Sequence, residues 1–192
     1  MEDSDSDLLV QYRNGRVQAL EQLVERYRRP LFGFILNMIG YREEADDVFQ
    51  EVWFRAIKSI DRYRDKRFLS WLFRIARNLV IDRYRSRKPL VSLDGVNQEG
   101  VALKDVIPDQ GRSAATLTDN HDVARRVAAA VATLPVEQKE VFLMRLEGEL
   151  SFKEIAKIQR VSINTALARM QYALAKLRDL LKHESHSRGV PS

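Results

Sequence analysis

Cations and aromatic rings are concentrated together in one stretch of the chain. From Asp61 to Lys88 there are ten Lys or Arg and three Asp, a net charge of +7, whereas the whole chain carries +5. Five rings lie among these charges: Tyr63, Phe68, Trp71, Phe73 and Tyr84. Cations can neutralise a nucleic-acid backbone while rings stack on unpaired bases, so this composition favours a surface for single-stranded or distorted DNA. A solvated amphipathic helix is the plainer alternative.

A second group of polar side chains stands near the end of the chain. Ser151 and Glu154 have the spacing of a capping box for a short helix, and a brief break near Arg160 leads to a longer helix that Ser162 can cap. This is the layout of a helix-turn-helix, whose second helix enters the major groove. Polar residues at the start of that helix could contact base edges and phosphates: Ser162, Asn164, Thr165 and Arg169. The core between the two helices is expected to consist of Ile155, Ala156, Val161, Ile163, Ala166 and Met170. A plain pair of packed helices is the alternative.

A third group is acidic. Carboxylates gather between Glu43 and Glu51 on a predicted helix, and Glu44, Asp47 and Glu51 project along one face of it. Such a face cannot be the DNA surface, because like charges repel. It is either a solvated face that complements the helix dipole or a docking surface for a basic protein.

Residues suited to catalysis are sparse. His121 is isolated, and His183 and His186 fall in a polar tail. The chain has no Cys, and the sequence contains no glycine-rich phosphate loop, paired-carboxylate site or nucleophile motif. We therefore expect neither an enzyme, nor a cofactor, nor a metal site.

Helical periodicity dominates the elements that must position these groups. Apolar residues recur at helical spacing in the ranges 8–15, 17–39, 41–60, 68–85, 119–134, 135–147, 151–159 and 162–182. Gly15 and Gly40 are expected to end helices, and Pro30 to kink or break one. In the range 68–85 the apolar face is expected to consist of Leu69, Leu72, Phe73, Ala76, Leu79, Val80 and Tyr84. The flank or opposite side of that helix is expected to carry Trp71, Arg74, Arg77, Asn78 and Arg85.

The sequence predicts an all-α protein of two small helical domains joined by a flexible linker. The pattern is lost after residue 86, and we assign residues 89–118 to the linker. The N-terminal domain then spans 1–88, the C-terminal helix-turn-helix domain 119–182, and a polar tail 183–192. The most apolar stretch, "LFGFILNMIG", is shorter than the ~20 residues of a spanning helix, so we expect a cytoplasmic protein without stable membrane insertion.

Three separated motifs, in this order, resemble those of the extracytoplasmic-function sigma factors of bacterial RNA polymerase. The first is "A-x-D-x-x-Q-E" over Ala45–Glu51, the second "W-L-x-R-I-A-R-N-x-x-x-D" over Trp71–Asp82, and the third the terminal helix pair within Leu134–Arg178. The resemblance covers nearly the whole chain outside the linker and the tail. It implies a protein without a cofactor that directs core RNA polymerase to specific promoters and initiates DNA melting.

The resemblance assigns a role to each group of residues. It implies that the clamp helices of polymerase bind Asp47, Gln50 and Glu51. It implies that the minus-ten element is captured and melted by the loop 61–67 and the second motif, through Arg62, Arg64, Lys66, Arg67, Phe68, Trp71, Arg74, Arg77, Asn78 and Asp82. Nearby duplex phosphates would be held by Arg83, Arg85 and Arg87. The minus-thirty-five element would be recognised through Ser162, Asn164, Thr165, Arg169 and Gln171.

Two further expectations concern partners and departures from the family. The resemblance implies an anti-sigma factor that sequesters both domains in the cytoplasm, often at the inner face of the membrane. In the last helix, Leu167 and Ala168 replace a usual basic residue and Ser, and Tyr172 replaces a commonly basic residue. Contacts with the minus-thirty-five (distal) element therefore either shift to Asn164, Arg169 and Gln171 or become weaker.

Two other classes of protein remain as alternatives. A self-sufficient helix-turn-helix regulator would bind duplex DNA without polymerase, usually as a dimer on a two-fold site. A structural helical adaptor would bind no nucleic acid, and the charge concentrated in residues 61–88 argues against it.

Overall fold

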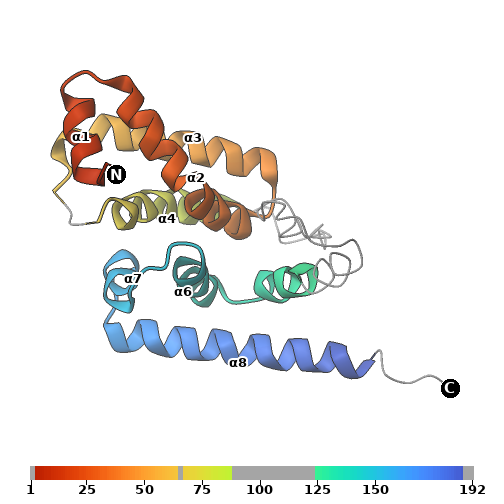
Figure 1. The fold of residues 1–192 in the computed structure, drawn as a ribbon. Coiled ribbons are helices and arrows are strands. Elements are labelled where there is room, and N and C mark those ends of the chain that lie inside the picture. Colours follow the sequence, from red (N-terminus) through yellow and green to blue (C-terminus); the bar gives the residue numbers. More distant parts are fainter. Residues whose placement is uncertain (1–2, 65–66, 88–123, 188–192) are drawn as a thin grey trace.

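The computed structural model describes residues 3–64, 67–87 and 124–187, and within these ranges every regular element is a helix (Figure 1). The N-terminal half contains α1 (Asp5–Arg13), α2 (Val17–Ile39), α3 (Arg42–Ser59), the short 3₁₀ helix η1 (Ile60–Arg62) and α4 (Phe68–Arg87). The C-terminal half contains a helix over residues 124–132, then α6 (Val136–Leu146), α7 (Phe152–Gln159) and α8 (Ile163–Ser187). The predicted all-α class with two helical parts is confirmed. The predicted linker, 89–118, lies outside the described residues.

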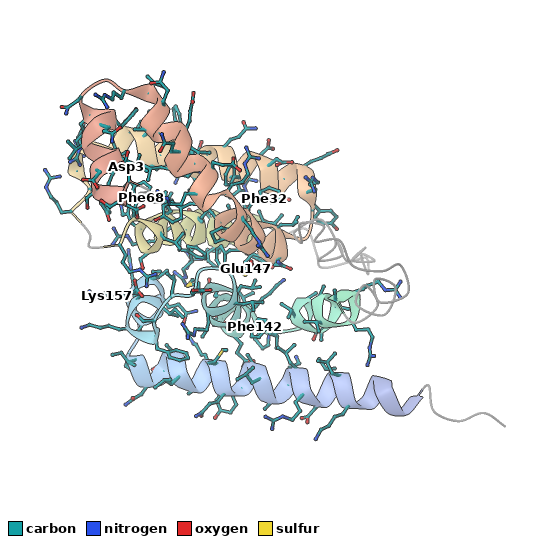
Figure 2. All side chains as sticks on the ribbon, viewed as in Figure 1. Asp3, Phe32, Phe68, Phe142, Glu147 and Lys157 are labelled. Atoms are coloured by element: carbon teal, nitrogen blue, oxygen red, sulfur yellow. The ribbon has the colours of Figure 1, made fainter. Side chains whose placement is uncertain are left out.

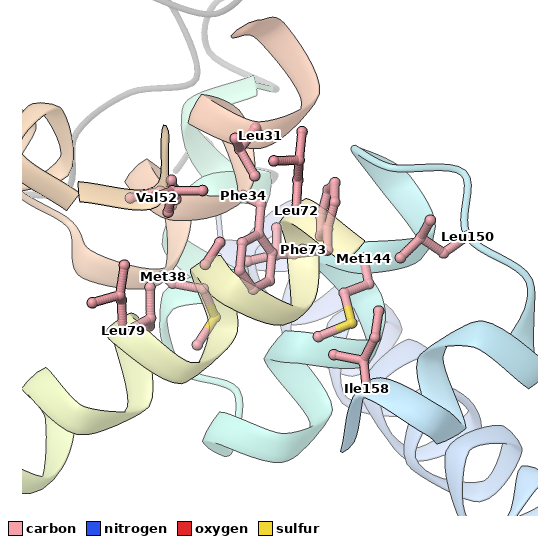
Figure 3. Packing of buried hydrophobic residues seen from close by; sticks show 14 of the residues in the cluster. Leu31, Phe34, Met38, Val52, Leu72, Phe73, Leu79, Met144, Leu150 and Ile158 are labelled. Atoms are coloured by element: carbon pink, nitrogen blue, oxygen red, sulfur yellow. The ribbon is translucent and has the colours of Figure 1, made fainter. Parts of the chain in front are cut away.

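The two halves pack against each other through α4. In Figure 1, α4 and the end of α2 face α6 and α7, while α8 runs along the far side of the C-terminal half. The buried apolar side chains form one cluster that continues across this boundary. Figure 3 shows Phe34 and Phe73 from the N-terminal half close to Met144 from the C-terminal half. Burial of apolar surface therefore stabilises the contact between the halves as well as each half.

A close approach at Gly148 lets the two halves meet. The buried ring of Phe73 has its centroid 5.1 Å from that of Phe34. On the other side, a Cβ atom at Gly148 would lie only 2.7 Å from Cζ of Phe73. Any side chain at position 148 would thus force the Phe73 ring or one half of the protein to move.

Local sequence signals explain where some of the helices begin or end. Ser4 and Asp7 form a capping box, so α1 begins at Asp5, three residues before the predicted start. The second capping box, Ser151 with Glu154, begins α7 as predicted. Gly40 ends α2 in the left-handed region at φ 87°, a conformation that glycine adopts without steric cost.

One alternative at Pro30 is excluded, and one predicted helix end is wrong. The expectation at Pro30 was a kink or a break, and no break occurs, because α2 continues through it from Val17 to Ile39. A proline inside a helix costs about 3 kcal/mol, which the packing of buried side chains on both sides, such as Leu23 and Phe34, can offset. The last helix also extends beyond the predicted end at residue 182, because α8 reaches Ser187 and takes in the first part of the tail. Over residues 3–64, 67–87 and 124–187, each helix is either too short or too polar to span a bilayer.

Lys139 is a buried cation in α6 whose replacement should stabilise the protein. Burial lowers the pKa of Lys139 to about 8, from an ordinary value of 10.5. Between these two pH values the unfolded chain binds a proton that the folded chain does not, so the free energy of unfolding rises with pH across this window. We expect Lys139→Met to raise the free energy of unfolding at pH 7 by about 2–3 kcal/mol and to abolish that rise. Urea unfolding at pH 7 and pH 10 measures both effects.

Lys153→Met is the matched control for this prediction. Lys153 lies on α7 and is exposed, so the same substitution there removes a charge without relieving burial. Its free energy of unfolding should follow the wild-type dependence on pH. A wild-type protein whose stability stays flat between pH 8 and pH 10 would contradict the buried cation.

Candidate nucleic-acid interface

Four predicted DNA-contacting residues lie on one outward face of α4. Arg67 just precedes the helix and is followed at helical spacing by Arg74, Asn78 and Arg85, and all four are exposed. The opposite face of α4 carries the buried residues Leu72, Ala76 and Leu79. The predicted division of this helix into an apolar and a basic side is therefore confirmed for these residues. Such a row of cations with an amide can bind a phosphate backbone.

The predicted exposure of two aromatic residues is wrong. Trp71 was expected on the flank or the opposite side of α4, and Trp71 and Phe68 were both among the rings expected to stack on unpaired bases, but they are only 7% and 1% exposed. Their ring centroids lie 5.4 Å apart, and that of Tyr63 lies 5.0 Å from Trp71. Figure 2 shows Phe68 inside the N-terminal half. Aromatic burial is favourable enough to draw these rings into the core, so in this conformation neither has a face on which a base could stack.

The remaining predicted cations around this surface differ in their surroundings. Arg62 and Arg64 are exposed, and Arg64 donates hydrogen bonds to the carbonyl oxygens of Asp61 and Tyr63, at 2.7 and 2.8 Å. Arg83 instead turns toward α3, where its Nη1 lies 3.1 Å from the carbonyl oxygen of Glu44. Arg83 thus ties two helices together in this structure. Lys66 lies outside the described residues.

The helix-turn-helix has the predicted local geometry. Arg160 turns the chain between α7 and α8 in the left-handed region at φ 58°, and Ser162 caps α8 by accepting a hydrogen bond from the Thr165 backbone at 3.0 Å. At the start of α8, Asn164 and Thr165 are exposed, and Gln171 follows on the exposed side. One predicted core residue is wrong: Ile163 is 46% exposed.

Two carboxylates of the C-terminal half contact residues that belong to the predicted minus-ten surface. Glu154 on α7 places Oε2 3.0 Å from Nη1 of Arg67 and accepts a hydrogen bond from Ser70 Oγ at 2.6 Å. Glu140 on α6 places Oε2 3.0 Å from Nε of Arg77. Both carboxylates therefore lie against α4, on the flank between its exposed face and its core.

The Glu140 carboxylate is also linked to the helix-turn-helix. Gln159 donates a hydrogen bond to Glu140 Oε2 at 2.6 Å and accepts one from Arg169 at 2.8 Å. Glu140 is fully buried, and burial raises its pKa although Arg77 and Gln159 oppose the change. Burial alone would raise the pKa of Glu154. The pKa is nevertheless lowered overall by hydrogen bonds from Ser151 and Ser70 and by the charge of Arg67. Arg77 and Arg169, each predicted to contact a different promoter element, are thus joined by hydrogen bonds through the buried residues Glu140 and Gln159.

The acidic face of α3 is a separate surface. Asp47 and Gln50 are exposed, and Glu51 is partly exposed with an ion pair of 2.7 Å to Arg55. The opposite side of α3 packs into the core. Phe54 follows Gln50 by four residues and is 52% exposed, so an aromatic ring extends the same face. We call residues Asp47, Gln50, Glu51 and Phe54 the α3 surface.

Comparisons with known proteins agree with the order of these elements. A family model for Sigma-70 region 2 matches residues 23–89, and one for Sigma-70 region 4 matches residues 124–177. The chain is 31% identical to the ECF RNA polymerase sigma factor SigM of Mycobacterium tuberculosis, over 94% of this chain and 86% of that protein. It is 30% identical to the RNA polymerase sigma factor CnrH of Cupriavidus metallidurans, over 96% of this chain and 97% of that protein. This chain belongs to the extracytoplasmic-function sigma factors.

A solved structure supports the same assignment. The structure of CnrH in complex with the cytosolic domain of CnrY is similar with a TM-score of 0.67 and 27% identity, over 94% of this chain and 99% of that one. The function of the chain is that of an RNA polymerase sigma factor, and the self-sufficient regulator is not supported. In this sigma factor the region 2 match contains α3 and α4, and the region 4 match contains α6 and α7 with the first part of α8.

Sequence patterns did not reveal four residues of these surfaces. Phe54 falls outside the apolar stripe of α3. An aromatic residue outside that stripe could have predicted an exposed ring. Ser70 and Gln159 had no sequence signal, because their partners are distant along the chain. Glu140 stands at helical spacing from Val136, Leu143 and Met144 of α6, and an acid on that apolar face could have indicated a buried ion pair.

Proposed function

We propose that this sigma factor uses three surfaces during initiation. The α3 surface would bind the clamp helices of core RNA polymerase, the outward face of α4 with the loop 61–67 would hold the minus-ten element, and the start of α8 would recognise the minus-thirty-five element. The observation that carries the proposal is the separation of charge. The acids of α3 and the cations of α4 project from different helices, so a protein partner and DNA could bind at the same time.

The proposed minus-ten surface works mainly through cations. Arg67, Arg74 and Arg85 would neutralise phosphates, and Asn78 could donate to a phosphate or a base edge. Phe68 and Trp71 would have a supporting role, because their buried rings stabilise the end of the loop and the first turn of α4. Stacking on these two rings is left out of the proposal, since both would first have to leave the core.

The proposed minus-thirty-five surface relies on short polar side chains. Asn164 and Thr165 stand in the first turn of α8, where the positive end of the helix dipole favours a nearby phosphate. Tyr172 is 65% exposed and, with Leu167, occupies a place where relatives of the family commonly have cations. Neither side chain can neutralise a phosphate, so base contacts through Asn164 and Gln171 would contribute a larger share of the distal affinity.

The proposal includes a place of action and a regulatory partner. We infer that the protein acts in the cytoplasm as a non-enzymatic initiation factor without a cofactor, and that an anti-sigma factor binds it. The similarity to CnrH, whose solved structure contains the cytosolic domain of CnrY, supports a partner of this kind.

In vitro transcription tests the proposed function. Bacterial core polymerase is incubated with a pool of candidate promoters, with and without this protein, and the transcript starts are mapped. Transcripts that depend on the protein and begin at defined sites are expected, and their upstream sequences would identify both promoter elements. Absence of transcripts and of polymerase binding, together with a footprint of the protein alone on duplex DNA, would overturn the proposal.

Asn164→Ala tests base recognition by α8. We expect the variant to lose discrimination at one base pair of the distal element, by about 1–3 kcal/mol, because a bidentate amide contact would be removed. Transcription from a promoter panel with every base of the distal element varied measures this loss. Asp179→Ala, an exposed position further along α8, is the control and should leave the panel unchanged. A uniform decrease at all positions would instead indicate a phosphate contact.

A further inference from the structure

We propose that α7 carries a second DNA-binding surface of the C-terminal half, which holds backbone phosphates of the distal element through Lys153, Lys157 and Arg160. We call these three residues the α7 surface. The proposal rests on the proposed function, because it assumes that the start of α8 recognises that element. It goes beyond the proposed function, because its residues belong to another helix and its ligand is the DNA backbone.

Three cations lie along one exposed side of α7. Lys153 and Lys157 are four residues apart on the helix, and Arg160 follows three residues later at its C-terminal end, so helical geometry places all three on the same side. All three are exposed, whereas Ile155 and Ile158 on the other side are buried. Within residues 3–64, 67–87 and 124–187, none of the three cations takes part in an ion pair. Their charges are therefore available to an anion.

The position of α7 in the helix-turn-helix suits a contact with phosphates. In such a motif the second helix lies in the major groove while the first helix crosses the DNA backbone. Figure 1 shows α7 and the start of α8 at the same end of the C-terminal half. Cations beside the backbone replace condensed counterions, whose release favours binding. The α7 surface thus belongs to the helix that is expected to pass along the phosphates.

The exposed face of α8 leaves phosphate contacts to be supplied from elsewhere. Leu167 and Tyr172 are 36% and 65% exposed, and neither can neutralise a phosphate. Arg169 is a cation of α8, but its Nη1 donates a hydrogen bond of 2.8 Å to Oε1 of Gln159, which ties it to the end of α7. Contacts between cations and phosphates supply much of the affinity of proteins for duplex DNA. The α7 surface would provide the charges that α8 lacks at Leu167 and Tyr172.

The backbone conformation of Arg160 is an independent argument for a role of its side chain. Arg160 lies in the left-handed region, with φ 58° and ψ 47°. A residue with a Cβ atom is strained there, and glycine is the usual residue in this conformation after a helix. Glycine at position 160 would form the turn without this strain. The strained backbone together with an exposed guanidinium at the edge of the helix-turn-helix points to a functional contact.

Two substitutions of Arg160 separate DNA binding from stability. Arg160→Gly removes both the charge and the strain, so we expect an unchanged or higher midpoint of thermal unfolding together with weaker DNA binding. Arg160→Lys keeps the charge, so it should bind DNA like the wild type. A purely structural Arg160 predicts a different pattern, in which the glycine variant binds DNA as well as the wild type.

The double variant Lys153→Gln with Lys157→Gln removes the other two charges of the α7 surface. Its matched control is Arg178→Gln with Lys182→Gln, which removes two exposed cations from the far end of α8. These control positions lie about four helical turns or more beyond the start of α8, so they are remote from the groove. Both double variants have the same net charge, and an effect of general charge would appear in both.

The experiment measures binding of holoenzyme, assembled from bacterial core polymerase and each full-length variant, to a fluorescein-labelled promoter duplex found by the transcription experiment. A second duplex has a scrambled distal element, and the wild type should prefer the intact one. On the intact duplex we expect the Lys153 and Lys157 double variant to bind about tenfold and Arg160→Gly about threefold more weakly. The slope of log affinity against log salt concentration should become shallower by about 2 and about 1, since each phosphate contact contributes about 0.9. The control should keep the wild-type affinity and slope.

The outcomes distinguish failure of the α7 surface from failure of the proposed function. If the wild type prefers the intact duplex but the α7 variants keep its affinity and salt slope, or lose no more than the control, the α7 surface is overturned and the role of α8 is unaffected. If the wild type binds both duplexes equally, the role of α8 is overturned and the α7 surface with it. On promoters with each distal base pair varied, the losses should be uniform. A loss confined to one base pair would indicate a base contact and would overturn the assignment to phosphates.

Discussion

Reversal of two charges on the α3 surface, Asp47→Lys with Glu51→Lys, is expected to reduce association with core RNA polymerase at least about 100-fold. A like-charge contact in an interface costs several kcal/mol, and about 2.8 kcal/mol already corresponds to a factor of 100. Asp47 is exposed, and the surface ion pair of Glu51 with Arg55 adds little to stability. The fold should therefore stay intact, as circular dichroism and the unfolding midpoint would show. Affinity for fluorescently labelled core polymerase measures the effect.

The control for this double reversal is Glu21→Lys with Glu25→Lys. These two acids are exposed on α2 with the same four-residue spacing, so the change in net charge and in helix pattern is identical. Polymerase affinity of the control should stay within about twofold of the wild type, since surface charges far from an interface act weakly through salt. An equal loss in both double variants would show that total charge, and not the α3 surface, governs association.

The features that could be predicted from the sequence are those set by neighbours along the chain. Both capping boxes, Ser4 with Asp7 and Ser151 with Glu154, depend on groups three residues apart, and the periodic apolar faces of α3 and α4 depend on spacings of three and four. The end of α2 at Gly40 depends on one backbone conformation. For the second capping box and for Gly40 the prediction was correct, because the sequence contains the whole interaction.

The features that could not be predicted depend on the surface that meets each helix. Periodicity placed Trp71 on the flank of α4. Whether a residue on that flank is exposed or buried depends on the residues that cover it, here Tyr63 and the other rings. The continuity of α2 through Pro30 is likewise a result of tertiary packing, which outweighs local propensity. In both cases the local signal was present and a non-local contact overrode it.

The candidate site shows the same division. The cationic face of α4 and the polar start of α8 followed from helical spacing, and the structure places Arg74, Asn78, Asn164 and Thr165 on exposed faces. The contacts of α4 with Glu140 and Glu154 did not follow, because Arg77 and Glu140 are 63 residues apart and Ser70 and Glu154 are 84 apart. No periodic pattern connects positions at such separations. Contacts between the halves are therefore the part of this site that only a structure supplies.

Burial of Trp71 changes what its truncation should do. Trp71→Ala is expected to lower the free energy of unfolding of the N-terminal half by about 3–5 kcal/mol, the usual cost of removing a buried large aromatic side chain. The ring is 7% exposed and packs against Tyr63 and Phe68, so its loss leaves a cavity beside these two rings. The motif alone would predict a selective defect in DNA melting. The structure instead predicts that polymerase association and open-complex formation decrease together as the domain unfolds.

Trp71→Phe separates these two explanations, because phenylalanine fills most of the buried volume and keeps a ring that can stack. If Trp71 is structural, the phenylalanine variant should recover most of the free energy of unfolding, and polymerase association and permanganate reactivity of the melted strand should recover with it. A variant with near wild-type stability and association but a persistent melting defect would show that the indole itself contacts DNA. That result would require the ring to leave its contacts with Tyr63 and Phe68 during initiation.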